Sequence, residues 1–400
     1  MRGEMKNFFA ILISALTFLF SAQTDAAPYR IKWTADEADL NFAVALLKNE
    51  ARLNESNFII SPVSAYTAAV ILAQGCDGQS LDELRKYILT DSVNVPTDAI
   101  ADMTLKALQT YSKGAVVNIT MWGEDFNNEY KKVVGKFADI RALPLKTDYI
   151  NKWMNTSTKG EISGMLKSEW TDKKSVYYYN ITSFKDKWAD EFDWHKTKSR
   201  NFYSYGKQKP VKVNTMYARR FADYYEDDKM QAIRLWFQGN DFIEIFLPRR
   251  TVRFKKFMHD LQSDDLKLDY EKADVKIYIP RFEINSGVLD LRNIFGKFHV
   301  AKVFDPQNKD YDKMSSEPHT IQKIVAMTGL RVDETGTEAL PVPEDDEDET
   351  KDQEFGELPP KVFNADRPFV FMVSGGLLIG TYTQGEEIAR LIEEDEEEDW

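Results

Sequence analysis

The chain has 400 residues, of which 43% are hydrophobic, so it is long and apolar enough to bury a sizeable core. Its net charge of −13 argues against nucleic acid as a partner, because phosphate binding requires a basic surface. The acidity lies in two segments: residues 344–357 and 386–400 each hold nine acidic residues and one basic residue, which leaves 50 basic and 47 acidic residues elsewhere.

The N-terminal segment has the pattern of a secretory signal peptide. Arg2 and Lys6 precede the apolar run Phe8–Phe20, and a cleavage site with small residues lies at Thr24–Ala26. We therefore expect residues 1–26 to be a signal peptide and the protein to be secreted and extracellular. A membrane span needs roughly 20 apolar residues. This run is shorter, so we expect no membrane insertion.

Hydrophobic periodicity predicts helices and strands along the rest of the chain. Apolar residues at helical spacing predict a helix over Asp36–Arg52, and a short apolar strand follows over residues 57–62. Ser80 and Glu83 form a predicted capping box that opens a helix through Tyr87. The other predicted elements include a helix over 64–73, a strand over 116–122, a helix over 127–137 and a strand over 176–180.

The residues that could carry catalysis or bind a metal show no supporting pattern. Cys76 is the only cysteine, and its place after an apolar helix predicts a packed free thiol with no internal disulfide. The four histidines lie in no spacing typical of a catalytic or metal site. The acidic runs lack the alternating pattern of a calcium loop. We therefore predict no enzyme activity, no metal and no cofactor.

An ordered set of short motifs runs through the chain. The first motif consists of Asn57, Ser61, Pro62, Ser64, Gly75, Gly78 and Ser80. The later motifs are Ile150–Met154, Thr158–Ile162, Asn180–Trp188, Val332–Ala339, Phe363–Phe369 and Leu377–Gly380. In type, spacing and order they resemble the motifs of the serpin family, and the resemblance runs from about Ala38 to Thr383.

This resemblance implies an α+β fold, with a single serpin domain of three β-sheets and eight or nine helices over residues 27–385 and an acidic tail over 386–400. It implies an exposed reactive-centre loop, here called the bait loop, over about residues 336–358. The hinge of this loop is Gly336, Thr337, Glu338 and Ala339. In this family a serine protease cuts the loop, which then enters the central sheet as a new strand. The resemblance thus implies a secreted, monomeric inhibitor of serine-type endopeptidases that regulates extracellular proteolysis.

The family's spacing gives two positions for the cut. Counting forward from Gly336 places the scissile bond near Thr350 and Lys351, whereas counting back from Phe363 places it near Glu357 and Leu358. The mismatch indicates a loop longer than usual, and both bonds stay open as candidates.

The bait loop departs from the family's pattern of small residues. Pro341 and Pro343 lack the N–H that an inserted strand donates to its neighbour. With Thr337 facing inward, alternation also turns Asp345 and Glu347 inward, where unpaired carboxylates are costly. Full insertion is therefore disfavoured. The alternative function is that of a non-inhibitory serpin that binds or carries a molecule, or presents its acidic segments to a basic protein partner.

The resemblance also implies a hydrogen-bonded cluster under the central sheet, called the shutter, which controls opening of the sheet. Ser61, Ser64, Asn118 and Asn180 match this cluster, whereas the family's histidine position holds Ala326. Loss of that partner is expected to weaken the opened arrangement of the sheet.

Four glycosylation sequons begin at Asn54, Asn118, Asn155 and Asn180. Asn118 and Asn180 fall in predicted strands at shutter positions, so we expect them to be buried and unmodified. Asn54 and Asn155 lie in polar stretches, so we predict glycans at these two positions.

Three basic clusters stand out in the nearly neutral part of the chain. They are Lys196, Lys198 and Arg200; Lys207, Lys209 and Lys212; and Arg249, Arg250, Arg253, Lys255 and Lys256. These clusters are either ordinary solvated faces or a resting place for the acidic loop or tail, and the sequence supports both interpretations equally. If the acidic loop or tail rests on a basic cluster, this docking is sensitive to salt, because contacts between exposed charges weaken beyond the Debye length, which is about 8 Å at physiological ionic strength.

Overall fold

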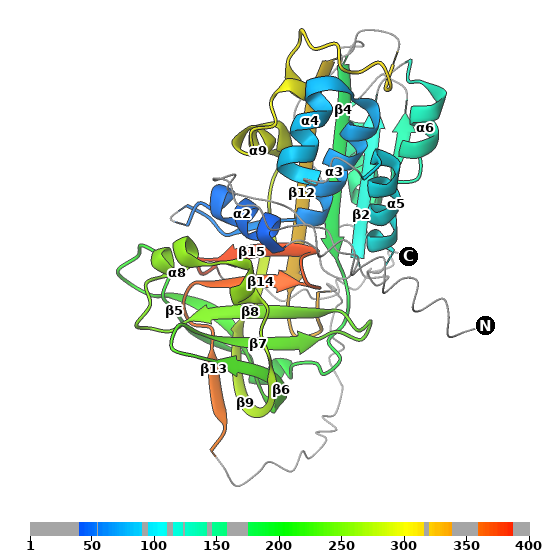
Figure 1. Ribbon diagram of the computed structural model, residues 1–400. Coiled ribbons are helices and arrows are strands. Elements are labelled where there is room, and N and C mark those ends of the chain that lie inside the picture. Colours follow the sequence, from blue (N-terminus) through cyan, green and yellow to red (C-terminus); the bar gives the residue numbers. More distant parts are fainter. Residues whose placement is uncertain are drawn as a thin grey trace, which may run out of the picture.

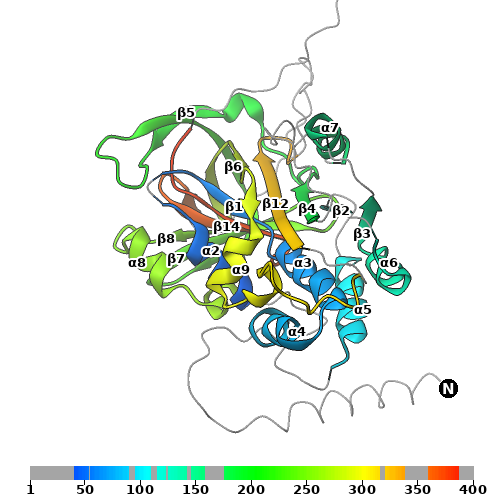
Figure 2. The ribbon, with the colours of Figure 1, turned by 90° about the horizontal axis from the view of Figure 1, so that it is seen from above.

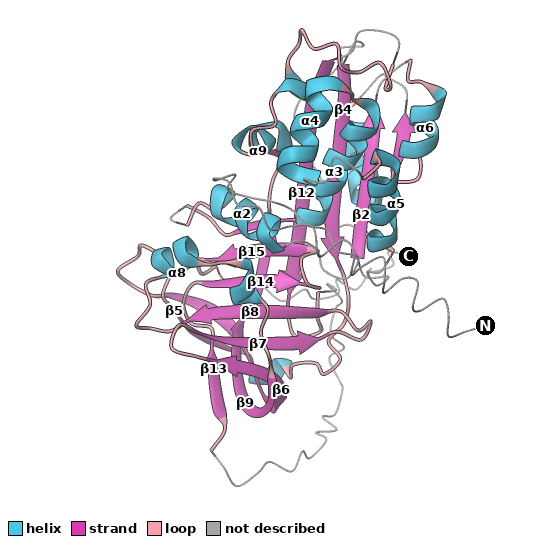
Figure 3. Cartoon of the chain, in the orientation of Figure 1, coloured by secondary structure: helices cyan, strands magenta, loops and turns pink. Residues whose placement is uncertain are grey.

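The structure is a computed structural model of the chain, and it describes residues 40–53, 55–89, 95–109, 115–122, 125–141, 146–157, 175–315, 320–337 and 359–386. The fold is α+β, as the resemblance implies. Figure 1 shows the helices α3 to α6 packed around one sheet at one end of the molecule. The other end is built mainly from strands (Figure 3).

Eight α-helices lie within the described ranges. They are α2 (Leu40–Glu50), α3 (Pro62–Gly75), α4 (Gly78–Leu84), α5 (Thr97–Leu108), α6 (Asn128–Val134), α7 (Thr147–Ser157), α8 (Phe254–Asp260) and α9 (Leu291–Lys297). A π-helical turn at Arg85–Leu89 continues α4. Short 3-10 turns occur at Trp194–Lys196, Ser263–Leu266 and Lys302–Phe304. No helix in the described part of the chain is long and apolar enough to cross a membrane.

The smaller of two hydrogen-bonded sheets is the central sheet. Its strands follow the order β10-β12-β4-β2-β3, and β11 pairs with the side of β12. The bounds are β2 (Ala115–Trp122), β3 (Ala138–Arg141), β4 (Ser175–Phe184), β10 (Phe282–Asn285), β11 (Leu289–Asp290) and β12 (Thr320–Val332).

The larger sheet contains nine strands in the order β1-β15-β14-β8-β7-β6-β9-β13, with β5 paired to β6. Its bounds are β1 (Phe58–Ile60), β5 (Lys198–Phe202), β6 (Val211–Glu226), β7 (Met230–Trp236), β8 (Phe242–Pro248), β9 (Glu271–Pro280), β13 (Lys361–Asn364), β14 (Phe369–Val373) and β15 (Leu378–Tyr382). The long strand β6 joins two parts of this sheet, because its start pairs with β5, the stretch from Thr215 to Tyr224 pairs with β9, and its end pairs with β7. Because β6 belongs to both parts, two of the three expected sheets are joined, and the described strands form two continuous sheets.

Helix α3 supports the central sheet from beneath. Ser61 caps the helix, since its Oγ accepts a hydrogen bond from the Ser64 N–H at 3.1 Å, and Pro62 occupies the first turn, where no N–H is needed. The helix is buried along nearly its whole length and packs against β4 and β12 (Figures 1 and 2). The apolar run after Pro62 thus forms a core helix instead of an amphipathic surface helix.

The predicted capping box of Ser80 and Glu83 is wrong. Helix α4 begins at Gly78, and Ser80 donates from both its N–H and its Oγ to one carboxylate oxygen of Asp310, each at 3.1 Å. The Glu83 carboxylate instead accepts hydrogen bonds from the backbone N–H groups of residues 301–302. Contacts with a segment distant in sequence have replaced the local motif.

Cys76 is buried in the larger hydrophobic core at the end of α3, and burial raises the pKa of its thiol. Because the thiolate is the reactive form of cysteine, we predict that folded protein will not react with a maleimide. Unfolded protein should add one maleimide, and the mass of the intact chain measures this difference. Rapid labelling of the folded protein would place Cys76 outside the core.

Candidate functional site

Strands β4 and β12 lie side by side at the centre of the smaller sheet. They are parallel and directly paired, from Thr320 opposite Ser175 to Gly329 opposite Ser183, with a bulge between Ile321 and Lys323. Both views of the ribbon show the two strands adjacent (Figures 1 and 2). No strand separates them, so the central sheet is closed. We call the line between these two strands the seam.

The chain after β12 folds back onto the chain after β4 at one end of the seam. The Trp188 N–H donates to the Thr335 carbonyl at 2.9 Å, and the Thr337 N–H donates to the Asp186 carbonyl at 2.8 Å. The Thr337 Oγ1 also accepts from the Asp186 N–H at 2.8 Å, and Thr337 is fully buried. We call this region, residues 186–188 with 333–337, the mouth of the seam. The first hinge residues thus lie against the sheet.

Gly336 is required by the close contact between these two segments. Its φ of +145° is one that L side chains rarely adopt. A Cβ added there would lie 2.2 Å from the Asp186 carbonyl oxygen and 2.7 Å from the Lys187 Cα. A larger residue would therefore force the two chain segments apart.

A buried ion pair holds the mouth together. Glu334 is 4% exposed, and the Arg281 guanidinium donates to both of its carboxylate oxygens, from Nε at 3.1 Å and from Nη2 at 2.5 Å. The Thr197 Oγ1 donates to the same carboxylate at 2.5 Å. The Phe192 N–H bonds to the Glu334 carbonyl at 2.9 Å. Glu334 thus ties the start of the bait loop to three other segments.

Asp333 shapes the turn that leads into the hinge. Its carboxylate accepts from the Thr335 N–H at 3.0 Å and from the Arg331 Nε at 3.3 Å. The indole N–H of buried Trp188 donates to the Asp333 carbonyl at 2.7 Å. The acidic pair before Gly336 therefore has a structural role in the mouth. No local sequence pattern marks Arg281 and Thr197 as the partners of Glu334, so these two residues were not predicted.

Three of the predicted shutter residues, Ser61, Ser64 and Asn180, lie together beneath the seam. The Asn180 Nδ2 donates to the Ser64 carbonyl at 3.2 Å, and Ser61 caps α3 beside them. Asn118 lies on β2 opposite Ile181. Ala326 lies opposite Asn180 across the seam. The Ser64 Oγ and the Asn180 Oδ1 are buried without a hydrogen-bond partner among the described residues.

Several predicted features lie outside the described residues. These are the signal peptide 1–26, Asn54, Glu338, Ala339, both candidate scissile bonds (Thr350, Lys351, Glu357 and Leu358) and residues 387–400 of the acidic tail.

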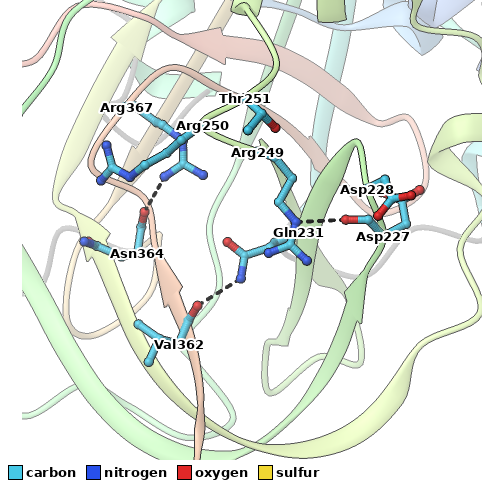
Figure 4. Close-up of a pocket in the computed structure, with 9 residues that line it drawn as sticks. All are labelled: Asp227, Asp228, Gln231, Arg249, Arg250, Thr251, Val362, Asn364 and Arg367. Atoms are coloured by element: carbon cyan, nitrogen blue, oxygen red, sulfur yellow. Dashed lines mark hydrogen bonds between the residues drawn. The ribbon is translucent and has the colours of Figure 1, made fainter.

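A cavity of about 590 Å³ opens on the larger sheet (Figure 4). The Arg249 Nε donates to the Asp227 carbonyl at 2.8 Å, the Arg367 Nη2 donates to the Pro248 carbonyl at 2.7 Å, and Arg250 pairs with Asp366. The lining residues are Asp227, Asp228, Gln231, Arg249, Arg250, Thr251, Val362, Asn364 and Arg367. This set contains no histidine, serine or cysteine. The described residues also contain no group of His, Cys, Asp and Glu that could hold a metal ion.

We predict that Glu334→Gln will lower the free energy of unfolding by about 3–5 kcal/mol, because it leaves the buried Arg281 guanidinium without its counter-charge. Denaturant unfolding of the purified protein measures this loss. The control is Asp102→Asn, which breaks an ion pair of 3.4 Å with Lys136 in which both side chains are about half exposed. That change should cost less than about 1 kcal/mol. Equal losses in the two variants would contradict a special role for the mouth.

We predict a glycan at Asn155 and none at Asn180 in secreted protein. Asn155 is exposed on α7, whereas Asn180 is fully buried in β4. Asn54 remains the second predicted acceptor. Mass spectrometry of glycopeptides, before and after enzymatic deglycosylation, tests all three sites. Occupied Asn180 in folded protein would be incompatible with its place under the seam.

Comparisons with known proteins confirm the resemblance seen in the sequence. A family model described as Serpin (serine protease inhibitor) matches residues 37–376. The chain is 24% identical to Serpin B5 of Xenopus laevis over 365 residues, which is 84% of this chain and 92% of that protein. It is 23% identical to Serpin B6 of Macaca fascicularis over 333 residues, which is 76% of this chain and 86% of that protein.

The fold is also similar to that of human thyroxine-binding globulin. The TM-score is 0.75 at 19% sequence identity, and the match covers 87% of this chain and 97% of the globulin. The family model spans most of the chain, including the strands that form the seam and the hinge residues at its mouth, and the protein therefore belongs to the serpin family.

Proposed function

We propose that this protein is a secreted inhibitor of serine-type endopeptidases that regulates extracellular proteolysis through its bait loop, residues 336–358. One observation carries the proposal. The seam between β4 and β12 is closed, and the first loop residues, Gly336 and Thr337, are held at its mouth. A loop that starts at this point can enter the sheet from its first residue onward.

The first residues of the loop already run antiparallel to the chain that follows β4, which is the direction of an inserted strand. Gly336 forms an antiparallel bridge with Lys187, just beyond the end of β4. A strand that continued from this bridge would replace the parallel ladder between β4 and β12 with two antiparallel ladders, which are slightly more stable per residue. Strand insertion after cleavage is the known mechanism of this family, and it releases stored strain.

Two sequence features support a site of action outside the cell. The signal-peptide pattern of residues 1–26 predicts export. The predicted glycan acceptor Asn155 is exposed, so a glycan attached there would not disturb the core. The partner we propose is an extracellular serine protease that recognises the long acidic loop.

A second candidate function is that of a non-inhibitory serpin that binds or carries another molecule. The observation that favours it is the burial of Thr337. With Thr337 facing inward, alternation turns Pro341 and Pro343 inward as well, and neither can donate a backbone hydrogen bond. One of the similar solved structures is a globulin named for binding thyroxine. Insertion limited at these prolines would turn the protein into a substrate of the protease instead of a trap.

Mixing the purified protein with trypsin-like, chymotrypsin-like and elastase-like serine proteases separates the two candidates. The proposed inhibitor forms an SDS-stable complex with at least one of them, accompanied by a large share of loop-cleaved protein because the prolines limit insertion. Loop cleavage by every protease without any complex would refute inhibition and support the second candidate.

The double variant Pro341→Ala, Pro343→Ala tests how far the prolines limit insertion. It restores two backbone donors, so the ratio of complex to cleaved protein should rise, and the cleaved form should melt at a higher temperature than cleaved wild type. The matched control is Pro359→Ala, Pro360→Ala, a pair that follows both candidate cut sites. Equal behaviour of the two double variants would show that Pro341 and Pro343 do not control insertion.

A further inference from the structure

The hairpin formed by β5 and β6 brings two of the three basic clusters together. The register places Arg200 opposite Val213 and Asn201 opposite Lys212, so the cations of both strands share one hairpin. No aspartate or glutamate occurs between Asp193 and Asp223. We call this segment, residues 196–212, the basic hairpin. Its cations are Lys196, Lys198, Arg200, Lys207, Lys209 and Lys212.

Most cations of the basic hairpin have no acidic partner within the described ranges. All of them are exposed, and only Lys196 forms an ion pair with a described residue, Asp193, at 2.9 Å. Arg200 lies over the ring of Tyr278, with 4.5 Å between its guanidinium carbon and the ring centroid. This contact leaves its charge uncompensated by any described carboxylate. The five remaining charges are therefore grouped on one hairpin with no acidic partner among the described residues.

The third basic cluster differs, because acids already compensate much of it. Arg249 pairs with Glu226 at 2.8 Å, Arg250 pairs with Asp366, and Lys256 pairs with Asp260. Two of the three arginines that line the cavity of Figure 4 belong to this compensated group. The hairpin is therefore the better site for an anionic ligand.

The described part of the chain stops directly against the base of the basic hairpin. The Gly385 N–H donates to the Ser204 Oγ at 2.9 Å, and the Tyr205 N–H donates to the Thr383 carbonyl at 2.8 Å. A Cβ on Gly385 would lie only 2.6 Å from the Val211 side chain, which shows how closely the two segments pack. Whatever follows Glu386 therefore starts beside the hairpin.

The segment that follows is strongly acidic. Residues 387–400 contain eight acidic residues and one basic residue, with seven consecutive acids over Glu393–Asp399. Glu393 is seven residues beyond Glu386, and seven extended residues span at most about 25 Å. The acidic run is thus tethered near the five uncompensated cations. A tether of this length gives a local concentration on the order of millimolar.

We propose that residues 387–400 dock on the basic hairpin of the same chain as an intramolecular anionic ligand. The hairpin is then an anion-binding surface that the tail covers, and an external polyanion must displace the tail to reach it. Several exposed charge pairs act together, so docking is strong at low salt and is lost at high salt. The hairpin also contacts the chain that returns from the bait loop, because the Tyr203 N–H donates to the Asp366 carbonyl at 2.8 Å.

Carbodiimide cross-linking of the full-length protein tests the position of the tail. This reagent joins a carboxylate to a lysine amine in direct contact. At low salt the tail should cross-link to Lys198, Lys207, Lys209 or Lys212, and these products should disappear at about 1 M salt, where the Debye length falls to about 3 Å. The control is Lys255, which is exposed in the third cluster. Tail products at Lys255 in equal yield, or no tail products at all, would overturn the proposal.

Chromatography on immobilised heparin, used as the polyanion probe, tests whether the tail covers the hairpin. Protein truncated after Glu386 should elute at higher salt than the full-length protein. In the truncated protein, Lys198→Gln, Arg200→Gln and Lys212→Gln together should reverse this shift. The matched triple Arg253→Gln, Lys255→Gln and Lys256→Gln should leave most of the shift in place. Equal elution of full-length and truncated protein, or equal effects of the two triples, would refute the proposal.

Discussion

The hydrogen-bond ladder between the parallel strands β4 and β12 is the constraint on which the rest of the structure depends. It forms the centre of the smaller sheet, α3 supports it from beneath, and the bait loop starts at its end. Parallel pairing is slightly less stable per residue than antiparallel pairing. A sheet with this seam would therefore gain free energy by admitting an antiparallel strand, and the contacts at the mouth hold the start of the loop against the closed sheet.

Polar groups are satisfied at the mouth and left without partners in the interior of the seam. Glu334 is bonded to Arg281 and Thr197. Further along the seam, five buried side-chain oxygens have no hydrogen-bond partner among the described residues: those of Ser64, Asn180, Thr182, Ser183 and Thr328. A buried polar atom without a partner costs roughly 1–3 kcal/mol. The closed sheet is thus held at its mouth by hydrogen-bonded polar groups, whereas several polar side chains along the seam lack such bonds among the described residues.

Local patterns predicted the elements of this fold, but not the contacts between distant residues. The apolar runs around Ser61 and Asn180 correctly gave β1, α3 and β4, because burial of a continuous segment is visible in its own sequence. The sequence around Glu334 does not indicate which residue pairs with its carboxylate. Its partner Arg281 lies 53 residues away, and any of 52 lysines and arginines could have filled that role. The false capping box failed for the same reason, since Ser80 bonds to a carboxylate 230 residues away.

The burial of Thr337 determines which loop residues would face the interior of the seam. Side chains alternate along a strand, so Ala339, Pro341 and Pro343 would follow Thr337 inward. Alanine brings no side-chain donor, and proline lacks even the backbone N–H. This loop can therefore extend the ladder that Thr337 begins, but it cannot supply the donor that the Asn180 Oδ1 lacks among the described residues. Insertion of Pro341 and Pro343 would therefore gain less free energy than insertion of small residues that donate a backbone N–H, and in the proposed inhibitor this difference favours cleavage of the loop over trapping of the protease.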